Sequence, residues 1–143
     1  MTVEEKKLKL ETFVILIDRV EVLRAELEDM RARAVALTQN ISDLPQGTID
    51  GSKPERALES IERSIKKLIQ EETAACETID CVITAISKLS DTREQQIMSL
   101  KYIGEKKGNA YKRYVLWEIA VRMGYSLDRI KQLHGSALRN LQL

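Results

Sequence analysis

The feature that most constrains the fold is a run of apolar residues in the N-terminal third of the chain. Successive members are alternately three and four residues apart, which is the spacing of a heptad seam. The members are Phe13, Leu16, Val20, Leu23, Leu27, Met30, Ala34, Leu37 and Ile41. A helix brings this spacing onto one face, whereas a strand does not. The sequence therefore predicts one long helix over about residues 3–40.

A second long helix is expected over about residues 55–89, after a loop at 42–54. Pro45, Gly47 and Gly51 favour the loop, and Pro54 suits the first turn of a helix. The apolar stripe of this second helix comprises Leu58, Ile61, Ile65, Leu68, Ala75, Ile79, Val82, Ile86 and Leu89, widened by Ile69, Cys76 and Ile83. A wide stripe indicates packing on more than one neighbour. Glu72 interrupts it, either as a polar contact that sets the register or with its carboxylate in water.

The two long helices are expected to form an antiparallel, coiled-coil-like hairpin. Two helices alone bury little surface, so we expect the hairpin to pair with a second copy as a homodimer. The alternative is that it packs only on the C-terminal part of its own chain. Composition agrees with an all-α fold, because only 4% of the residues are aromatic and only two are Pro. The expected domains are residues 1–89 and residues 90–143.

Several functional classes are disfavoured. The longest apolar run, residues 13–17, is too short to span a membrane, and no signal peptide is visible, so a cytoplasmic protein is expected. Cys76 and Cys81 are five residues apart on one expected helix, beyond disulfide reach, and His134 is the only His. We expect two reduced, mostly buried thiols and neither metal nor cofactor. Without a phosphate-binding loop or a nucleophile–base pair, an enzyme is not expected.

The C-terminal residues have the pattern of a helix-turn-helix. Helices are expected at about 115–123 and 127–141. Their buried faces would comprise Leu116, Ile119, Ala120 and Met123 in the first, and Ile130, Leu133, Ala137, Leu138 and Leu141 in the second. Gly124 suits the left-handed residue that ends the first helix, and Ser126 suits the cap of the next. In such a unit the start of the second helix enters the DNA major groove.

The polar side of that second helix supplies the candidate DNA-binding residues, although a merely solvated face is the alternative. These candidates are Ser126, Asp128, Arg129, Lys131, Gln132, Ser136 and Arg139. Gln132 can pair with adenine, and Lys131 can reach guanine or a phosphate. Asp128 can accept from cytosine or orient Arg129. Ser126 and Arg139 suit phosphates, and His134 is expected to pack rather than read bases.

Charge is divided unevenly along the chain. Residues 1–89 contain 13 Lys and Arg against 17 Asp and Glu, whereas residues 90–143 contain 10 against 5. A basic C-terminal module beside an acidic N-terminal one is expected when only one of them meets phosphate.

A connecting segment precedes the helix-turn-helix. Asp91 and Glu94 have the spacing of a capping box at the start of a helix over about 92–103. Residues 104–114 are expected to form either a mobile loop or a basic arm on the phosphate backbone. The arm would use Lys106, Lys107, Lys112 and Arg113. Trp117 is expected to pack between the hairpin and the helix-turn-helix.

Residues 89–141 carry a resemblance to region 4 of bacterial sigma factors. The matching residues are Arg93-Glu94, Ile97-Met98, Leu100, Lys101-Tyr102, Glu118-Ile119-Ala120, Gly124, Ser126, Arg129-Ile130, Lys131-Gln132, Leu133 and Ala137-Leu138-Arg139. Two features differ, since Leu127 stands where sigma factors often carry Arg and residues 104–114 exceed the usual connection. With its hairpin, the chain is similar to small sigma-region-4-like proteins of phages and prophages of Gram-positive bacteria, including the ArpU- and RinA-type regulators of late transcription.

This resemblance implies major-groove DNA binding, with Asp128, Arg129, Lys131 and Gln132 facing bases or nearby phosphates. Three functions follow from the sequence. The first is a phage-type transcription regulator that binds double-stranded DNA as a dimer. The second is a small terminase-like DNA-packaging subunit that forms a ring. The third is an interaction module that docks on RNA polymerase.

Overall fold

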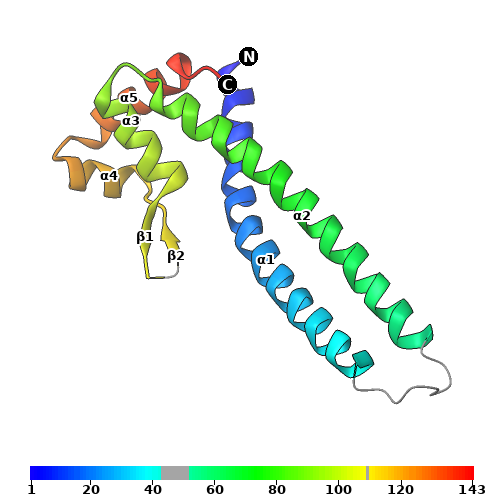
Figure 1. The fold of residues 1–143 in the computed structure, drawn as a ribbon. Coiled ribbons are helices and arrows are strands. Elements are labelled where there is room, and N and C mark those ends of the chain that lie inside the picture. The colour runs from blue at the N-terminus through cyan, green and yellow to red at the C-terminus, as the bar shows by residue number, and fades with distance from the viewer. Residues whose placement is uncertain (43–51, 109) are drawn as a thin grey trace. The chain divides into compact units, whose positions relative to one another are not determined.

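The computed structural model describes residues 1–42, 52–108 and 110–143. Their regular secondary structure is helical apart from a short two-stranded ribbon (Figure 1). The elements are α1 (Val3–Ser42), α2 (Ser52–Ser87), α3 (Thr92–Met98), η1 (Ser99–Ile103), β1 (Glu105–Lys107), β2 (Ala110–Lys112), α4 (Leu116–Met123) and α5 (Leu127–Asn140). The predicted all-α fold, with a long helix pair before a helix-turn-helix, is confirmed. Pro45, Gly47 and Gly51 of the predicted loop lie outside the described residues.

The contacts divide the chain into two compact units. One contains residues 1–17 and 77–143, and the other contains residues 18–76. The first unit therefore combines the start of α1 and the end of α2 with all the later elements. Whether residues 90–143 fold on their own stays a prediction. Within the described ranges, no helix is long and apolar enough to cross a membrane.

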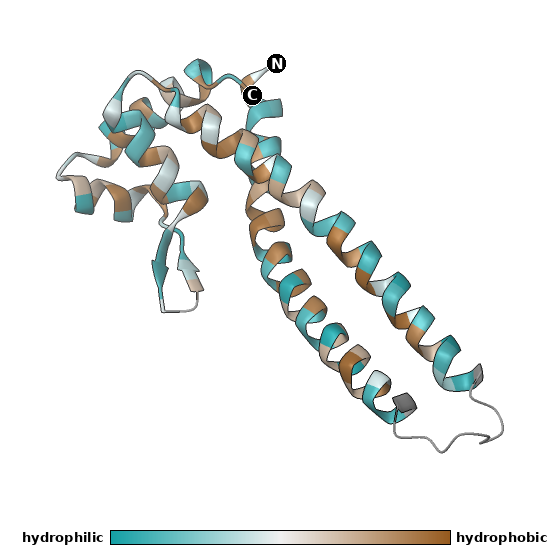
Figure 2. Ribbon diagram, viewed as in Figure 1, coloured by the Kyte–Doolittle hydropathy of each residue, from teal (hydrophilic) through white to brown (hydrophobic). Residues whose placement is uncertain are grey.

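The unit of residues 18–76 is an antiparallel helix pair, on which apolar and polar segments alternate along each helix (Figure 2). Its buried residues are Val20, Leu23, Leu27 and Ala75, and the first three belong to the predicted seam. Ion pairs bridge the two helices, from Arg19 Nε to Glu71 Oε1 at 3.3 Å and from Arg24 Nε to Glu72 Oε1 at 3.0 Å. Glu72 thus makes the polar cross-helix contact that was one of its two predicted roles.

The unit of residues 1–17 and 77–143 has two apolar cores. The first joins the start of α1 and the end of α2 to α3, η1 and α5 through Leu10, Phe13, Val82, Ala85, Ile86, Leu89, Met98, Tyr102, Ala137, Leu138 and Leu141. The second lies between the helix-turn-helix and its scaffold, by which we mean α3 and η1. It comprises Ile97, Leu100, Tyr114, Ile119, Ala120, Ile130 and Leu133. We call residues 1–17 of α1 and residues 77–89 at the end of α2 the hairpin base. Residues of α3 and η1 contribute to both cores, so these two elements connect the hairpin base to the helix-turn-helix.

At the start of α3, only one half of the predicted capping box is present. Asp91 caps α3 as expected, because its carboxylate accepts from the Arg93 N–H at 2.9 Å. Glu94, however, is 3% exposed and accepts from the Asn140 side-chain amide at 3.3 and 3.4 Å. The Gln95 amide donates to the carbonyls of Ser87, at 3.1 Å, and Leu89, which satisfies the end of α2. The tertiary partner of Glu94 therefore replaces its predicted local one.

Glu105–Lys107 and Ala110–Lys112 form an antiparallel ribbon, which is a more regular structure than the mobile loop that was one of the two predictions for residues 104–114. Glu105 pairs with Lys112, Lys106 with Tyr111, and Lys107 with Ala110. The entry to the ribbon requires Gly104, which has a φ of +87°. A Cβ there would stand 2.5 Å from the Lys112 carbonyl oxygen. At the exit, the Tyr114 N–H donates to the Leu100 carbonyl at 3.0 Å.

Two predictions about single side chains need correction. Cys76 is half-buried and Cys81 is exposed, and both are free thiols, so the expectation of two mostly buried thiols was wrong. Cys81 is exposed because Val82, Ala85 and Ile86 occupy the core side of α2. Trp117 does not pack between the hairpin and the helix-turn-helix, since it is 62% exposed.

Candidate nucleic-acid interface

The turn between α4 and α5 has the geometry that the sequence predicted. Gly124 adopts a left-handed conformation with φ of 74° and ψ of 27°, and its N–H donates to the Ala120 carbonyl. Tyr125 N–H donates to the same carbonyl at 3.1 Å, which closes the end of α4. The Ser126 hydroxyl then accepts from the Arg129 N–H at 3.2 Å and caps α5. A non-glycine residue would strain this turn.

The leading half of α5 presents its polar side to solvent. Asp128, Arg129, Lys131 and Gln132 are all exposed, whereas Ile130 and Leu133 are buried against α4 and the scaffold. One Arg129 guanidinium N–H donates to the Gln132 side-chain oxygen at 3.4 Å. The four predicted residues therefore lie together on an accessible surface, where amide, guanidinium, ammonium and carboxylate groups can meet base edges.

The inner side of α5 is fixed by polar contacts as well as apolar ones. His134, 9% exposed, shares a 2.9 Å hydrogen bond between its Nε2 and the Tyr102 hydroxyl. Burial, with smaller contributions from Lys101 and Lys7, lowers the pKa of His134 to about 4. Burial also raises the pKa of Tyr102 to about 12. The His134 packing role predicted from the sequence agrees with this position.

The far end of α5 is tied to the first turns of α1. The Lys6 ammonium donates to the carbonyls of Leu138, at 2.9 Å, and Arg139, at 3.0 Å. These carbonyls have no partner within the helix, and a cation there also interacts favourably with the helix dipole. Because the contact fixes α5 to the hairpin base, the direction of the exposed face is set by residues far apart in the sequence.

The remaining candidates on α5 lie away from its leading half. Ser136 is half-buried and Arg139 is exposed. Arg139 follows the Ser126 cap by 13 residues, about 20 Å along the helix axis. The structure therefore groups Ser126, Asp128, Arg129, Lys131 and Gln132, and leaves Arg139 to a more distant part of any DNA site.

The ribbon divides its predicted basic residues between two faces. Lys107 and Lys112 lie over the Tyr114 ring, at 6.0 and 4.9 Å from its centre, and Lys112 also pairs with Glu118 at 3.5 Å. Lys106 is exposed and pairs across the ribbon with exposed Tyr111. The Arg113 guanidinium donates to the Tyr102 carbonyl at 3.1 Å. Lys106 is thus exposed on the opposite face of the ribbon from Lys107 and Lys112.

An acid–base clamp that the sequence analysis missed attaches the ribbon to α4. The Glu105 carboxylate accepts from both terminal nitrogens of Arg122, one of them at 2.7 Å, and from the Tyr114 hydroxyl at 3.0 Å. The Arg122 hydrogen bonds lower the pKa of Glu105, and Glu105 in turn raises the pKa of Arg122. The only sequence signal was a lone acid at the head of a basic segment. The clamp fixes the ribbon beside the helix-turn-helix.

The outer face of α4 is apolar and exposed. Trp117 and Val121, one helical turn apart, are 62% and 77% exposed, and Tyr125 follows at 38%. The buried face of α4 carries Ile119 and Ala120, so this spacing turns Trp117 outward.

Two helices joined through a left-handed glycine, with the polar side of the second exposed, define a helix-turn-helix of the DNA-binding class. The family model for Sigma-70, region 4 matches residues 85–143. This part of the chain is therefore similar to region 4 of sigma-70 factors, and the match indicates a DNA-binding role for it. No curated protein and no solved structure matches the chain. The matched segment begins at Ala85, so it includes Ala85 and Ile86 of α2, which enter the first core, and leaves out Val82.

Proposed function

We propose that the chain is a sequence-specific, DNA-binding transcription regulator of the phage type, which acts as a homodimer through its N-terminal hairpin. The observation that carries the proposal is the exposed polar start of α5 on a helix whose other side is buried in two cores. A rigidly held helix with accessible Lys131 and Gln132 meets the requirement for reading base edges. The activity is binding, with no catalytic step.

The residues have separate roles in this proposal. Lys131 and Gln132 contact base edges, and Asp128 orients Arg129 or accepts from cytosine. Ser126, Ser136 and Arg139 contact phosphates of the DNA backbone that borders the major groove. The ribbon adds phosphate contacts through Lys106, Lys107, Lys112 and Arg113, which strengthen binding without sequence preference.

Sequence preference tests the proposal. The double variant Lys131→Ala, Gln132→Ala should lose discrimination among DNA sites, because a good bidentate base contact contributes about 1–3 kcal/mol, roughly five- to 150-fold. Selection of bound sites from random duplexes, followed by fluorescence anisotropy on the selected site, measures this. The matched control is Lys66→Ala, Gln70→Ala, which makes the same two changes at exposed positions of α2. Unchanged preference in the first variant would contradict the proposal.

The outer face of α4 favours RNA polymerase as a second partner. An exposed Trp beside an exposed Val is a surface that protein partners bury. Replacing Trp117 and Val121 by Ser should reduce capture of polymerase by the immobilised full chain and leave the affinity for DNA unchanged. Equal capture by the wild type and this variant would remove α4 from the proposed interaction.

A further inference from the structure

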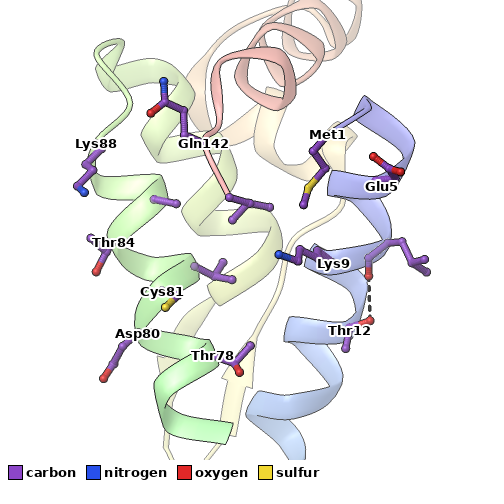
Figure 3. A pocket seen from close by; sticks show the side chains of 14 residues that line it. Met1, Glu5, Lys9, Thr12, Thr78, Asp80, Cys81, Thr84, Lys88 and Gln142 are labelled. Atoms are coloured by element: carbon purple, nitrogen blue, oxygen red, sulfur yellow. Dashed lines mark hydrogen bonds between the residues drawn. The ribbon is translucent and has the colours of Figure 1, made fainter. Parts of the chain in front are cut away.

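A groove of about 820 Å³ lies in the unit of residues 1–17 and 77–143, between the start of α1 and the end of α2. One wall carries Leu8 and Thr12 of α1, and the other carries Cys81, Val82 and Ala85 of α2. Figure 3 shows the two helices on opposite sides of this groove, with Gln142 near its upper end. Gln142 and Leu143, which follow α5, also line the groove.

The α1 wall exposes large apolar side chains. Leu8 is 64% exposed and Ile15 is 67% exposed, while Leu10 and Phe13 are fully buried on the other side of the helix. Leu8, Thr12 and Ile15 follow one another at steps of four and three residues, so they share a face. Met1, 61% exposed, extends the same surface at the chain start. An apolar strip of this kind is normally covered by a partner.

The charges around the groove indicate which partner covers it. Each helix contributes one acid and one base, Glu5 and Lys9 from α1, and Asp80 and Lys88 from α2. Such a rim carries no net charge, so it does not suit a phosphate backbone or an anionic lipid surface. It does suit a copy of itself. In a two-fold contact the same patch meets on both subunits, and each acid can then lie opposite a base of the other copy.

We infer that this groove is the contact between two copies of the chain, with Leu8 at its apolar centre and the four charges as its rim, and that exposed Ile15 extends the contact along α1. The inference rests on the proposed dimeric regulator and assigns its dimer contact to the hairpin base. Because the contact is two-fold, it closes after two copies. A packaging subunit that forms a ring would need a head-to-tail contact between two different patches instead.

A charge-swap pair tests the contact whichever two-fold orientation the copies adopt. Lys9→Glu with Lys88→Glu makes the rim wholly acidic, and Glu5→Lys with Asp80→Lys makes it wholly basic. Each double variant alone should be monomeric, since like charges across an interface weaken association by roughly a hundredfold or more. An equal mixture of the two should form a heterodimer. Light scattering after gel filtration measures each mass, and recovery in the mixture shows that both variants are folded.

The control is Lys66→Glu with Lys67→Glu, which makes the same charge change as the acidic-rim variant at exposed residues of α2 outside the groove. It should stay dimeric. A monomeric wild type, a ring of many copies, dimeric charge-swap variants or a mixture that stays monomeric would each overturn the inference. DNA binding by the same samples is read separately by anisotropy. A monomeric wild type that binds DNA would reject the groove contact and the homodimer but keep the DNA-binding role, whereas a dimer that binds no DNA would reject the DNA-binding role and keep the contact.

Discussion

His134 lies on the inner side of α5, behind the residues proposed to face DNA. Its imidazole is in contact with the Tyr102 hydroxyl, and the two ring centres are 5.9 Å apart. Neither ring is free to turn, because both side chains are more than nine-tenths buried. A polar pair of this kind holds α5 to η1 in one register, whereas apolar packing alone tolerates small rotations of a helix.

The burial of His134 makes stability depend on pH, because it lowers the pKa of the imidazole. The folded-state pKa of His134 is about 4, against an ordinary value of 6.5. As pH falls below the ordinary value, the unfolded chain binds a proton that the folded chain does not, so the free energy of unfolding decreases. At about pH 5 the loss is about 2 kcal/mol relative to neutral pH. Urea denaturation at both pH values should show this loss in the wild type and not in His134→Gln. An equal loss in both proteins would assign it to other groups.

Residue-level predictions succeeded where a spacing rule decided the outcome. Ile119 and Met123 fixed the inner side of α4, and the same rule places Trp117 outside. The expectation that Trp117 packs between the hairpin and the helix-turn-helix did not use this rule. The capping-box prediction for Glu94 failed for a different reason. The local spacing matched a capping box, but the actual partner of Glu94 is Asn140, 46 residues away in the sequence. Spacing identifies faces, but it does not identify partners distant in sequence.

At the scale of elements, the helix-turn-helix was predictable and the ribbon was not. Gly124 and Ser126 are local signals with one structural meaning each, so the turn and the start of α5 follow from them. The strands of the ribbon are three residues long and mostly charged, and they lack the alternation that identifies a strand. The ribbon instead depends on tertiary contacts, namely the Gly104 backbone against Lys112 and the Glu105–Arg122 clamp.

A variant of the Glu105–Arg122 clamp tests whether the position of the ribbon, and not only its positive charge, contributes to DNA binding. In Arg122→Gln the ribbon loses the clamp to α4 and keeps the Lys112–Glu118 ion pair, so amide hydrogen exchange of the ribbon strands should become faster while that of α5 stays unchanged. DNA affinity should fall to a similar extent on all sequences, because phosphate contacts carry no preference.

Lys106→Gln is the matched control, since it removes one positive charge and leaves the clamp intact. Its ribbon amides should exchange as in the wild type. The slope of log affinity against log salt should become less steep by about 0.9, the value for one phosphate contact. Both outcomes are read by exchange mass spectrometry and by titrations at several salt concentrations. An unchanged salt slope would remove Lys106 from the interface.

For the whole molecule, the first core decides which segment folds as a unit. Leu10, Phe13, Val82, Ile86 and Leu89 come from the hairpin, and they cover α3, η1 and α5. Burying one side chain of this size contributes about 1.5–3 kcal/mol, and the net stability of a domain is only about 5–15 kcal/mol. The sequence predicted a boundary near residue 90 because the apolar stripe of the second long helix ends at Leu89 and the charge balance changes there, but neither signal reports which helix faces meet.

Two fragments distinguish these views. Residues 90–143 alone would expose Met98, Tyr102, Leu138 and Leu141, so we expect no cooperative thermal unfolding and poorly dispersed amide signals. Residues 1–17 joined by a short Gly/Ser linker to residues 77–143 keep both cores and the Lys6 contact with α5. This second fragment should unfold cooperatively by calorimetry and bind the selected DNA site. Cooperative unfolding of residues 90–143 alone would show that the hairpin base adds little to the stability of the helix-turn-helix, and would restore the boundary that the sequence predicted.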